Sequence, residues 1–332
     1  MKNILVTGGL GYIGSHTVVE LIENGYQPII IDDLSNTNIG VLERLKKITG
    51  LDVPYYQNDV CDITVLRKIL VDHQIDGVIH FAAFKAVGES VQFPLKYYQN
   101  NIGGLVSLLH AMEQCNIKNI VFSSSCTVYG QPDISPVDEN SAIKVANSPY
   151  GNTKQIGEEI LRDCSFLNAV ALRYFNPIGA HPSALIGELP LGVPNNLVPF
   201  ITQTAAGIRE KLTVYGNDYN TKDGTCVRDY IHVVDLAKAH VKAIAFIDKN
   251  STNHFEVFNI GTGNGFTVLE IIEAFETTNQ VKLNYTIGDR RAGDVEKVWA
   301  NTDKATNTLG WKAALDLNTM VESAWKWQLS LS

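Results

Sequence analysis

The hydrophobic pattern of the first half of the chain alternates short apolar runs with longer helical repeats. Apolar runs lie at residues 3–7, 28–31, 53–56, 77–81, 120–123 and 169–173. Apolar positions with helical spacing fill residues 15–24, 65–73 and 94–115, and another helix is expected to start at Tyr150. Strands and helices that alternate in this way form a mostly parallel sheet with helices on both faces. The pattern therefore predicts a doubly wound α/β fold whose ligands bind at the carboxyl ends of the strands.

The pattern changes after Arg173. Residues 176–196 are rich in proline and glycine, so we expect neither a helix nor a central strand there. Beyond them the spacing predicts helices over 197–207, 233–247, 268–277 and 317–328, strands over 212–215, 255–260 and 283–286, and a polar loop over 217–228. Irregular stretches of this length are commonly functional. We therefore expect a second, smaller substrate-binding lobe of mixed α/β structure over residues 176–332, with segments near 228–262 returning to pack on the first 175 residues.

Composition narrows the class of partner. The 332 residues are 45% hydrophobic, enough for a large core, and the net charge of -8 offers no basic surface for nucleic acid. The first apolar run is too short for a signal peptide or a membrane span, so we expect no membrane partner. Five cysteines without Cys-x-x-Cys spacing indicate free thiols and a cytoplasmic location. The eight histidines have no metal-ligand spacing, so we expect no metal site, and His80 is predicted to pack.

A glycine-rich turn, Gly8-Gly-Leu-Gly-Tyr-Ile-Gly14, joins the first strand to the first helix. Its glycines fit two frames, one starting at Gly8 and one at Gly9, and both continue through Gly11 and Gly14. In either frame a bare backbone lets a pyrophosphate approach the free N–H groups of a helix N-terminus. The strand before the turn and the helix after it favour this interpretation over a plain tight turn. Residues 1–175 are therefore predicted to form a Rossmann-type nucleotide-binding domain.

Acidic and small residues follow the next strands. Asp32 ends the second strand and can accept hydrogen bonds from both ribose hydroxyls of adenosine. Asp33 stands beside it without a nearby arginine, and two carboxylates would repel a 2′-phosphate, so NAD is favoured over NADP. Asp32 could instead cap a helix that starts near Ser35. Asp59-Val60 could frame the adenine, and residues 81–85 are apolar enough to lie beneath the dinucleotide.

Tyr150 and Lys154 are four residues apart and share one face of a predicted helix. A positive charge about 5 to 6 Å from a phenol favours the phenolate by roughly 3 kcal/mol, or about two pKa units. An oxidised nicotinamide ring would lower the phenol pKa further, so Tyr150 is a candidate base for a substrate hydroxyl. Ser125, after the fifth strand, could hydrogen-bond the same substrate oxygen. The alternatives are ordinary helix surface for the pair and turn chemistry for the serine.

Two arginines in the second half are candidates for binding a diphosphate. Arg228 lies in Val-Arg-Asp-Tyr-Ile-His232, and Arg291 lies three residues before Asp294. The planar guanidinium matches phosphate oxygens in pairs, and two that converge would bind a diphosphate firmly. The alternative is a pair of surface salt bridges with Asp229 and Asp294.

Taken together, these motifs resemble the extended short-chain dehydrogenase/reductase superfamily. Longer segments are similar to one family within it, the UDP-glucose 4-epimerases, and the likeness runs nearly end to end. The segments are FAAFKAVGESV at 81–91, LRYFNPIGAHPS at 172–183, PNNL at 194–197, GNDY at 216–219 and VRDYIH at 227–232.

The resemblance implies roles for individual residues. The expected NAD-binding positions are Gly8, Gly11, Tyr12, Ile13, Gly14, Asp32, Asp33, Asn36, Asp59, Val60, Phe81, Ala82, Ala83, Lys85, Asn100, Ser125, Tyr150, Lys154 and Phe175. The expected UDP-hexose positions are Ser125, Tyr150, Asn176, Asn196, Leu197, Thr213, Val214, Tyr215, Arg228, Tyr230, Arg291, Asp294 and Val298. The expected catalytic residues are Tyr150, Lys154 and Ser125.

The resemblance also implies a reaction, the 4-epimerisation of UDP-glucose and UDP-galactose with bound NAD. Tyr150 would take the proton of the sugar 4′-hydroxyl, Ser125 would hold that oxygen, and Lys154 would lower the phenol pKa. The 4-ketose would then turn over, held firmly only by its UDP part. Such enzymes are typically homodimers, here expected to pair the 94–115 helix and the helix from Tyr150.

One position departs from part of the family, and two rival functions remain. Some relatives carry tyrosine where this chain has Val298, so we expect room for an N-acetyl group and some epimerisation of UDP-GlcNAc and UDP-GalNAc. A nucleotide-sugar 4,6-dehydratase would need an Asp-Glu pair after the fifth strand, which residues 123–130 lack. A non-catalytic NAD-sensing regulator is the second rival, and the intact Ser125, Tyr150 and Lys154 argue against it.

Overall fold

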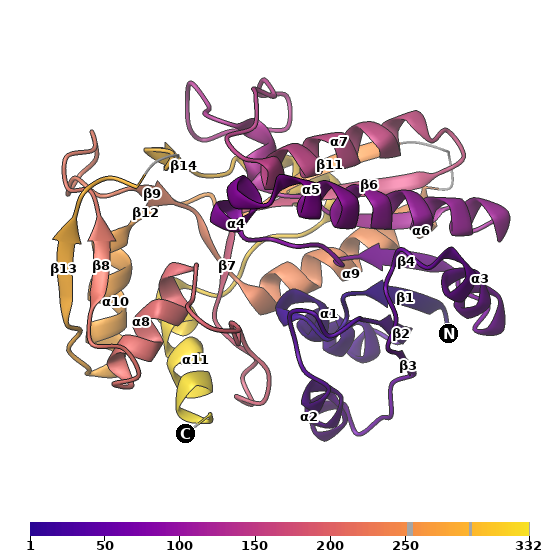
Figure 1. Cartoon of the computed structure of the whole chain (residues 1–332), viewed down its shortest axis with the longest axis horizontal. Coiled ribbons are helices and arrows are strands. Elements are labelled where there is room, and N and C mark those ends of the chain that lie inside the picture. The colour runs from indigo at the N-terminus through magenta and orange to yellow at the C-terminus, as the bar shows by residue number, and fades with distance from the viewer. Residues whose placement is uncertain (251–254, 292–293, 332) are drawn as a thin grey trace.

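The computed structural model describes residues 1–250, 255–291 and 294–331. Its centre is a seven-stranded sheet in the order β11-β6-β5-β4-β1-β2-β3, and every neighbouring pair is parallel (Figure 1). The strands are β1 (Asn3–Thr7), β2 (Gln27–Ile31), β3 (Tyr55–Tyr56), β4 (Gly77–His80), β5 (Asn119–Ser123), β6 (Asn168–Tyr174) and β11 (Phe255–Ile260). The predicted doubly wound α/β fold is confirmed, and the strand order reverses between β1 and β4, where ligands of such sheets bind.

Helices cover both faces of this sheet because successive strand residues point to opposite sides. In β1, Ile4 and Val6 pack under α1 (Tyr12–Glu23), α2 (Gly40–Thr49) and α9 (Val233–Lys249). Leu5 points the other way, toward α3 (Ile63–Asp72), α6 (Gly103–Gln114) and α7 (Pro149–Asp163). Both layers are buried, so the sheet forms the core of the molecule.

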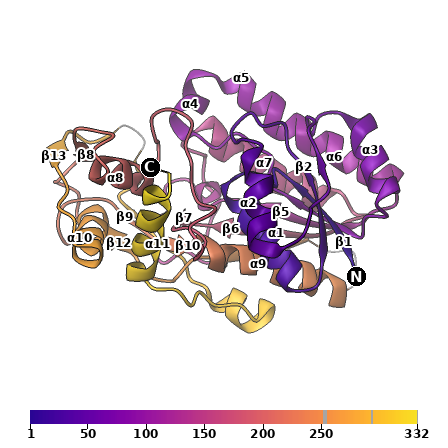
Figure 2. The ribbon, with the colours of Figure 1, turned by 90° about the horizontal axis from the view of Figure 1, so that it is seen from below.

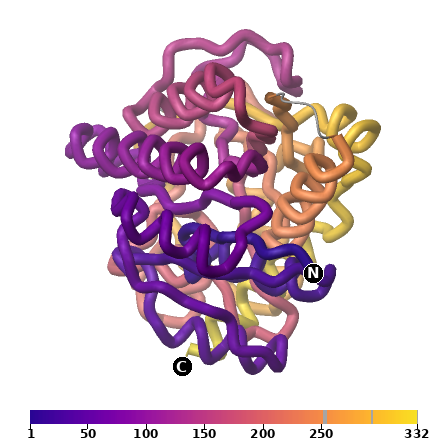
Figure 3. Tube along the Cα trace, turned by 90° about the vertical axis from the view of Figure 1, so that its right-hand side faces the viewer, coloured from indigo at the N-terminus to yellow at the C-terminus, as the bar shows by residue number. Residues whose placement is uncertain are grey.

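The predicted 94–115 helix is present but is not uniform. It consists of α5 (Pro94–Tyr97), a π-helical turn η1 (Tyr98–Ile102) and α6, and α4 (Val87–Gln92) precedes it. The segment of α2 was expected only as the alternative helix starting near Ser35, and α4, with six residues and no side-chain cap, was not predicted. Figures 1 and 3 show α6 lying beside α7.

A smaller lobe lies beyond the carboxyl ends of the strands, at the left of Figure 2. It contains the helices α8 (Leu197–Ala205), α10 (Val268–Asn279) and α11 (Leu317–Leu329), which share an apolar core. Its strands form three small sheets: β8 (Leu212–Tyr215) with β13 (Tyr285–Gly288), β7 (Asn176–Ile178) with β10 (Tyr230–His232), and β9 (Val227–Arg228) between β12 (Phe266–Thr267) and β14 (Lys297–Val298). Two shorter turns, η2 (Cys126–Tyr129) and η3 (Ala305–Leu309), complete the described elements.

Two segments expected to be irregular contain strand. Pro177 stands in the middle of β7, opposite Ile231 of β10. A proline is tolerated there because this two-stranded ladder leaves one edge of β7 without a partner strand. The predicted loop over 217–228 ends in the two residues of β9. This strand forms by pairing with β12 and β14, which are distant in the sequence, so no local pattern could predict it.

The chain crosses between its two halves more than once. After β10, α9 packs on α1 and β11 pairs with β6, so a segment that follows the lobe completes the large sheet. In the described part of the chain, every helix is too short or too polar to cross a membrane.

Candidate active site

The glycine turn after β1 has the geometry of an anion-binding loop. Gly8 has a φ of +69°, and a Cβ built on Gly14 would lie 2.2 Å from the Gly8 carbonyl oxygen. Gly11 precedes α1 with no side-chain cap, and the first turn of α1 holds no acidic residue. The structure therefore favours the frame Gly8, Gly11, Gly14, and the first N–H groups of α1, including those of Tyr12 and Ile13, lie where a pyrophosphate would bind.

Asp32 is fixed at the end of β2 by backbone donors. Its carboxylate accepts hydrogen bonds of 3.0 Å from the N–H groups of both Leu10 and Leu34. The helix that follows begins only at Gly40, so Asp32 does not cap it. Burial raises the pKa of Asp32 above its ordinary value, and the two backbone hydrogen bonds act in the opposite direction. The remaining lone pairs can accept the hydroxyls of a ribose.

The other expected cofactor positions line the same edge of the sheet. Asp33, Asn36 and Asp59 are exposed on the loops after β2 and β3, whereas Val60 is buried. Phe81, Ala82 and Ala83 follow β4, and the Ala82 N–H donates to Thr7 Oγ1 over 3.2 Å. The structure thus brings the ends of β1, β2, β3 and β4 together.

A structural amide holds the end of this segment. Asn101 accepts from the Phe84 N–H over 2.9 Å and donates to the Phe84 carbonyl over 3.0 Å. It also donates to Thr153 Oγ1 on α7 over 3.1 Å, and Asn100 donates to it over 3.0 Å. Asn100, the predicted residue, is half-buried, and Asn101 holds it between the end of β4 and α7.

Tyr150, Lys154 and Ser125 meet at the carboxyl end of β5. Tyr150 and Lys154 are 6% and 4% exposed, and the Lys154 ammonium lies 5.9 Å from the centroid of the Tyr150 ring. Lys154 Nζ donates to the Ser123 carbonyl over 2.7 Å, which directs it at the end of β5. Ser125 caps η2, and its side-chain hydrogen bond with Tyr150 acts to lower the pKa of the phenol. Ser148 caps α7 and so fixes where the helix begins.

The prediction that Lys154 lowers the pKa of Tyr150 is wrong for the protein alone. Burial raises the pKa of Tyr150 well above its ordinary value, Tyr174 acts in the same direction, and only the Ser125 hydrogen bond opposes them among the main causes. Burial also lowers the pKa of Lys154 to about 8, against an opposing effect of Glu158. Desolvation is the largest cause of both shifts, and neither group is among the main causes of the other's shift.

The two predicted arginines of the lobe converge on one carboxylate. Arg291 Nη2 lies 2.6 Å from Asp294 Oδ1, and Arg228 Nη2 lies 4.0 Å from the same oxygen. The alternative pairing of Arg228 with Asp229 is wrong. Asp229 is buried and accepts from the N–H groups of Thr262, Gly263 and Ala300 and from the Thr262 hydroxyl.

The remaining lobe positions surround these arginines. The Arg291 guanidinium lies 5.8 Å from the Tyr215 ring, and Thr213 shares that face of β8, whereas Val214 points into the apolar core. Tyr230 is buried in the same core, which raises its pKa to about 12. Val298 and Phe175 belong to a second apolar cluster with Tyr129 and Ala300.

A carboxylate that the sequence analysis passed over lies between the two halves. Glu188 Oε1 accepts from Lys85 Nζ over 2.8 Å and from Asn196 Nδ2 over 2.7 Å. It thus links an expected cofactor position to an expected substrate position, while Asn176 begins β7 and Leu197 begins α8 nearby in the chain. The sequence could have pointed to Glu188, because it is the only acidic residue between positions 176 and 196.

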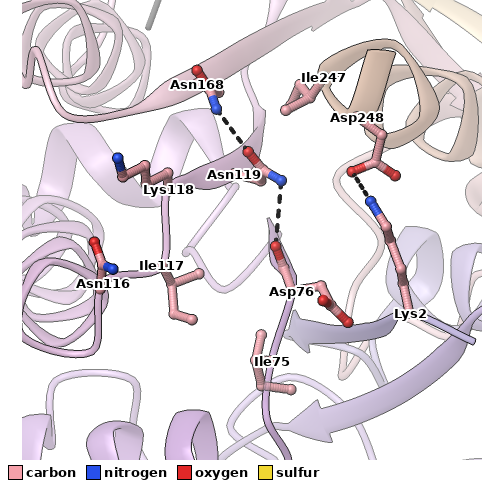
Figure 4. Close-up of a pocket in the computed structure, with 10 residues that line it drawn as sticks. All are labelled: Lys2, Ile75, Asp76, Asn116, Ile117, Lys118, Asn119, Asn168, Ile247 and Asp248. Atoms are coloured by element: carbon pink, nitrogen blue, oxygen red, sulfur yellow. Dashed lines mark hydrogen bonds and ion pairs between the residues drawn. The ribbon is translucent and has the colours of Figure 1, made fainter. Parts of the chain in front are cut away.

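One hollow of the structure, with a volume of about 360 Å³, lies away from this site (Figure 4). It opens at the amino ends of the strands, beside Asn119 and Asn168. Several of its polar groups pair with one another: Lys2 pairs with Asp248 over 2.6 Å, and Asn168 donates to Asn119 over 2.9 Å, whereas the buried Asn168 Oδ1 has no hydrogen-bond partner. In the part of the chain that the structure describes, no group of three His, Cys, Asp or Glu side chains is arranged to hold a metal ion.

Comparison with known proteins agrees with this geometry. Residues 5–324 match the family model described as GDP-mannose 4,6 dehydratase. The chain is 50% identical over 331 residues to the UDP-glucose 4-epimerase of Bacillus subtilis, covering 98% of this chain and 97% of that relative. It is 47% identical over 329 residues to the UDP-glucose 4-epimerase of Haemophilus influenzae, with 98% and 97% covered.

Solved structures give the same result. A UDP-glucose-4-epimerase from Stenotrophomonas maltophila with bound NAD and formylated UDP-arabinopyranose superposes with a TM-score of 0.97 at 46% identity, covering 100% of this chain and 99% of that one. The UDP-glucose 4-epimerase of Bifidobacterium longum in complex with NAD+ and UDP gives 0.95 at 45% identity, with 99% and 98% covered. The chain therefore belongs to the UDP-glucose 4-epimerase family, within the larger family that the dehydratase model describes.

Proposed function

We propose that this protein interconverts UDP-glucose and UDP-galactose by reversible oxidation at C4′ of the sugar, with NAD as a cofactor that stays bound. The observation that carries the proposal is the convergence of Ser125 and Lys154 on the Tyr150 phenol at the carboxyl edge of the sheet. The relatives named UDP-glucose 4-epimerase, and the NAD and UDP bound in solved neighbours, support it.

The residues present fit NAD. The turn at Gly8, Gly11 and Gly14 packs tightly, because a Cβ on Gly14 would lie 2.2 Å from the Gly8 carbonyl oxygen, and its bare backbone would let a pyrophosphate approach. The buried Asp32 carboxylate would accept the adenosine ribose hydroxyls and exclude a 2′-phosphate, and Lys85 would reach the dinucleotide from the end of β4. When bound, NAD supplies the chemistry of a hydride acceptor that later returns the hydride to the sugar.

The side chains of the site handle the proton. Tyr150 takes the proton as the O–H bond of the 4′-hydroxyl breaks and the C4′ carbonyl forms. Ser125 donates to that oxygen, and the Lys154 ammonium favours the phenolate. Because burial keeps the Tyr150 phenol neutral in the protein alone, Tyr150 becomes a base only when positive charge enters the site together with its ligands.

The lobe would bind the UDP part of the substrate more strongly than the sugar. Arg228 and Arg291 would exchange Asp294 for the diphosphate, whose two charges and fixed geometry suit two guanidiniums. The hexose would meet fewer charged groups, beside Val298 and Phe175. A strong hold on UDP and a weak hold on the sugar let the 4-ketose present both faces to the same Tyr150.

Incubation of the purified protein with UDP-galactose, without added NAD, tests this proposal. We expect UDP-glucose as the product and one dinucleotide per chain after denaturation. A 4-keto-6-deoxy product would instead favour the dehydratase, although the segment Ser124-Ser-Cys-Thr127 after β5 has no acidic pair. Binding of UDP-galactose without turnover would favour the NAD-sensing regulator.

We further propose that the protein is a homodimer formed by the helix of residues 94–114 and by α7. Its support is a set of exposed apolar side chains on α4, α5 and α6 and between α4 and α5, beside α7: Val91, Phe93, Leu95 and Val106. Side chains of this kind on one face of a protein commonly mark an interface. Sedimentation should give twice the chain mass, and Leu95→Glu should give single chains; a wild-type monomer would contradict the proposal.

We place the protein in the cytoplasm. The support is that all five cysteines carry free thiols, since compartments that form disulfides favour paired cysteines. Fractionation of cells followed by detection of the chain in the cytosol tests this assignment, and its recovery from an oxidising compartment would overturn it.

A further inference from the structure

A buried ion pair lies directly behind the catalytic residues and is not used by the mechanism above. Tyr150, Lys154 and Glu158 follow one another at four-residue intervals, so Glu158 shares their face of α7. Glu158 accepts from Arg173 of β6, with Nη2 at 2.6 Å from Oε2 and Nε at 2.9 Å from Oε1. Both side chains are 4% exposed, so neither charged group is hydrated by the solvent.

The carboxylate also holds the turn that carries Ser125. Ser124 is fully buried, and its hydroxyl donates to Glu158 Oε1 over 2.6 Å. Ser124 immediately precedes Ser125, so this hydrogen bond ties the end of β5 to the helix that carries Tyr150 and Lys154. No other side-chain hydrogen bond of Ser124 is described, which leaves Glu158 as the group that sets its position.

Arg173 extends the network away from the site. Its Nη1 donates to the Tyr129 hydroxyl over 3.0 Å, and that hydroxyl donates to Asn259 on β11 over 2.7 Å. The Asn259 N–H donates to Glu139 over 2.7 Å. The pair is therefore anchored in two strands of the sheet, and α7 cannot rotate without breaking it.

The titratable and charged groups around Lys154 lie on several elements. On its own helix these are Tyr150 and Glu158; β4 contributes His80, whose pKa burial lowers to about 3 and which therefore stays neutral. The remaining groups are Cys126 after β5, Arg173 and Tyr174 of β6, Tyr97 of α5, and Tyr129 and Glu139 around Arg173. Glu158, Arg173 and Glu139 carry the permanent charges among them; Glu158 and Arg173 pair and offset each other, and Glu139 accepts from the Asn259 N–H.

We propose that Glu158 is a positioning residue of this site: its carboxylate fixes Ser124-Ser125 against α7 and, balanced by Arg173, sets the charge that Lys154 faces. The proposal rests on the proposed epimerase function. It makes two separate statements, one about geometry and one about charge, and different variants test them.

Glu158→Gln tests the charge. It leaves the Arg173 cation without its partner, and an extra positive charge disfavours the Lys154 ammonium and favours the Tyr150 phenolate. Both limits of the plot of kcat against pH should therefore move to lower pH, by about one unit. A loss of activity through misplaced side chains alone would lower kcat and leave the limits unmoved. The exposed Glu159→Gln on the same helix is the matched control.

Ser124→Ala tests the geometry, because it removes one buried hydroxyl and no charge. We expect kcat to fall about tenfold, the scale of one lost hydrogen bond to a charged group, with KM and both pH limits unchanged. The double variant Glu158→Gln/Arg173→Met restores neutrality, so its pH limits should return to those of the wild type while its kcat stays low. If Glu158→Gln folds poorly, Ser124→Ala still tests the geometric statement and the double variant still tests the statement about charge.

A readout without substrate separates this proposal from the proposed function. In protein labelled at lysine Cε, the NMR signal absent from Lys154→Met reports the titration of Lys154. We expect a midpoint near 8 in the wild type and a lower one in Glu158→Gln. An unmoved midpoint together with wild-type turnover in Ser124→Ala would overturn the proposal, whereas a wild type that leaves UDP-galactose unchanged would overturn the epimerase itself.

Discussion

The two halves of the candidate site are built in opposite ways. Tyr150 and Lys154 are almost fully buried and are held by a capped helix, a strand end and a hydrogen bond to a main-chain carbonyl. Arg291 is 57% exposed at the side chain, and Arg228, at 17%, is bound to its own neighbour's carbonyl. The half proposed to perform the chemistry is fixed before any ligand arrives, whereas the half proposed to grip the ligand is held by one carboxylate, Asp294, that a diphosphate could replace. Substitutions should therefore affect turnover in the first half and affinity in the second.

Tyr150→Phe should have the largest effect, because it removes the only proposed proton acceptor and leaves the buried ring in place. We expect kcat on UDP-galactose to fall by about two to four powers of ten, with UDP affinity retained. Rapid-quench turnover and equilibrium binding of UDP measure the two quantities. Tyr285→Phe, on the exposed strand β13, is the control. A Tyr150→Phe enzyme that turns over like the wild type would remove Tyr150 from its role.

Arg291→Met should act on the other half. The loss of a charged hydrogen bond to the diphosphate should raise KM roughly 10- to 100-fold with little change in kcat. The neighbouring Arg290 provides a matched control, because it pairs with Asp218 over 2.6 Å and stacks over the Tyr219 ring at 4.1 Å. Equal effects of Arg290→Met and Arg291→Met would show that the arginines act only through the general charge of the lobe.

The buried core around the first half should make stability depend on pH. Burial lowers the pKa of His16 and His80 to about 3 and of His232 and His240 to about 4. Between these values and 6.5 the unfolded chain binds more protons than the folded one, so stability falls as pH falls below about 6.5, by about 2 kcal/mol per histidine at pH 5. Urea unfolding at pH 7 and pH 5 measures the difference.

His80→Gln should shrink that difference between pH 7 and pH 5 by about 2 kcal/mol, whatever it does to stability at pH 7. His110→Gln, at an exposed position of α6, should leave it unchanged. A pH dependence equally reduced by both variants would mean that the four buried histidines are not its source.

Val298→Tyr should have the smallest effect and concerns the sugar alone. Val298 is 6% exposed in the apolar cluster with Phe175 and Tyr129, and a larger ring there would occupy space beside the expected hexose site. We expect epimerisation of UDP-GlcNAc by the wild type, and a drop of about tenfold in its kcat/KM in the variant. UDP-galactose is the internal control. A ratio between the two substrates that the substitution leaves unchanged would refute the proposed N-acetyl tolerance.

What the sequence predicted follows the same division. The glycine turn, Asp32 and the Tyr150–Lys154 pair depend on strand and helix periods that are local in the chain, and the structure has them where the pattern placed them. The sequence analysis did not single out Glu158, four residues after Lys154, because its partner Arg173 lies on a strand, and strand pairing has no local signal. The sequence pattern could not predict contacts such as this one, which depend on which strands become neighbours.

The lobe was less predictable for the same reason. The sheet β12-β9-β14 is made of two-residue strands from three distant segments, which is too short for any period to be recognised. Asp229 illustrates the consequence: its sequence neighbour Arg228 suggested an ion pair, but the loop at Thr262 and Gly263 provides its partners. The direction of the Tyr150 pKa also required the structure, because burial cannot be read from a spacing of four residues.

The late position of β11 in the chain affects how the protein folds during its synthesis. The open side of β6 is covered only when residues 255–260 arrive, and the apolar side of α1 only when α9 does. During synthesis, the nucleotide-binding half therefore waits with a bare strand edge until β11 has left the ribosome, after α8 and the strands β7 to β10 of the lobe, and such edges recruit other chains. A fragment cut after residue 175 should aggregate, so this half cannot be transplanted as an independent module.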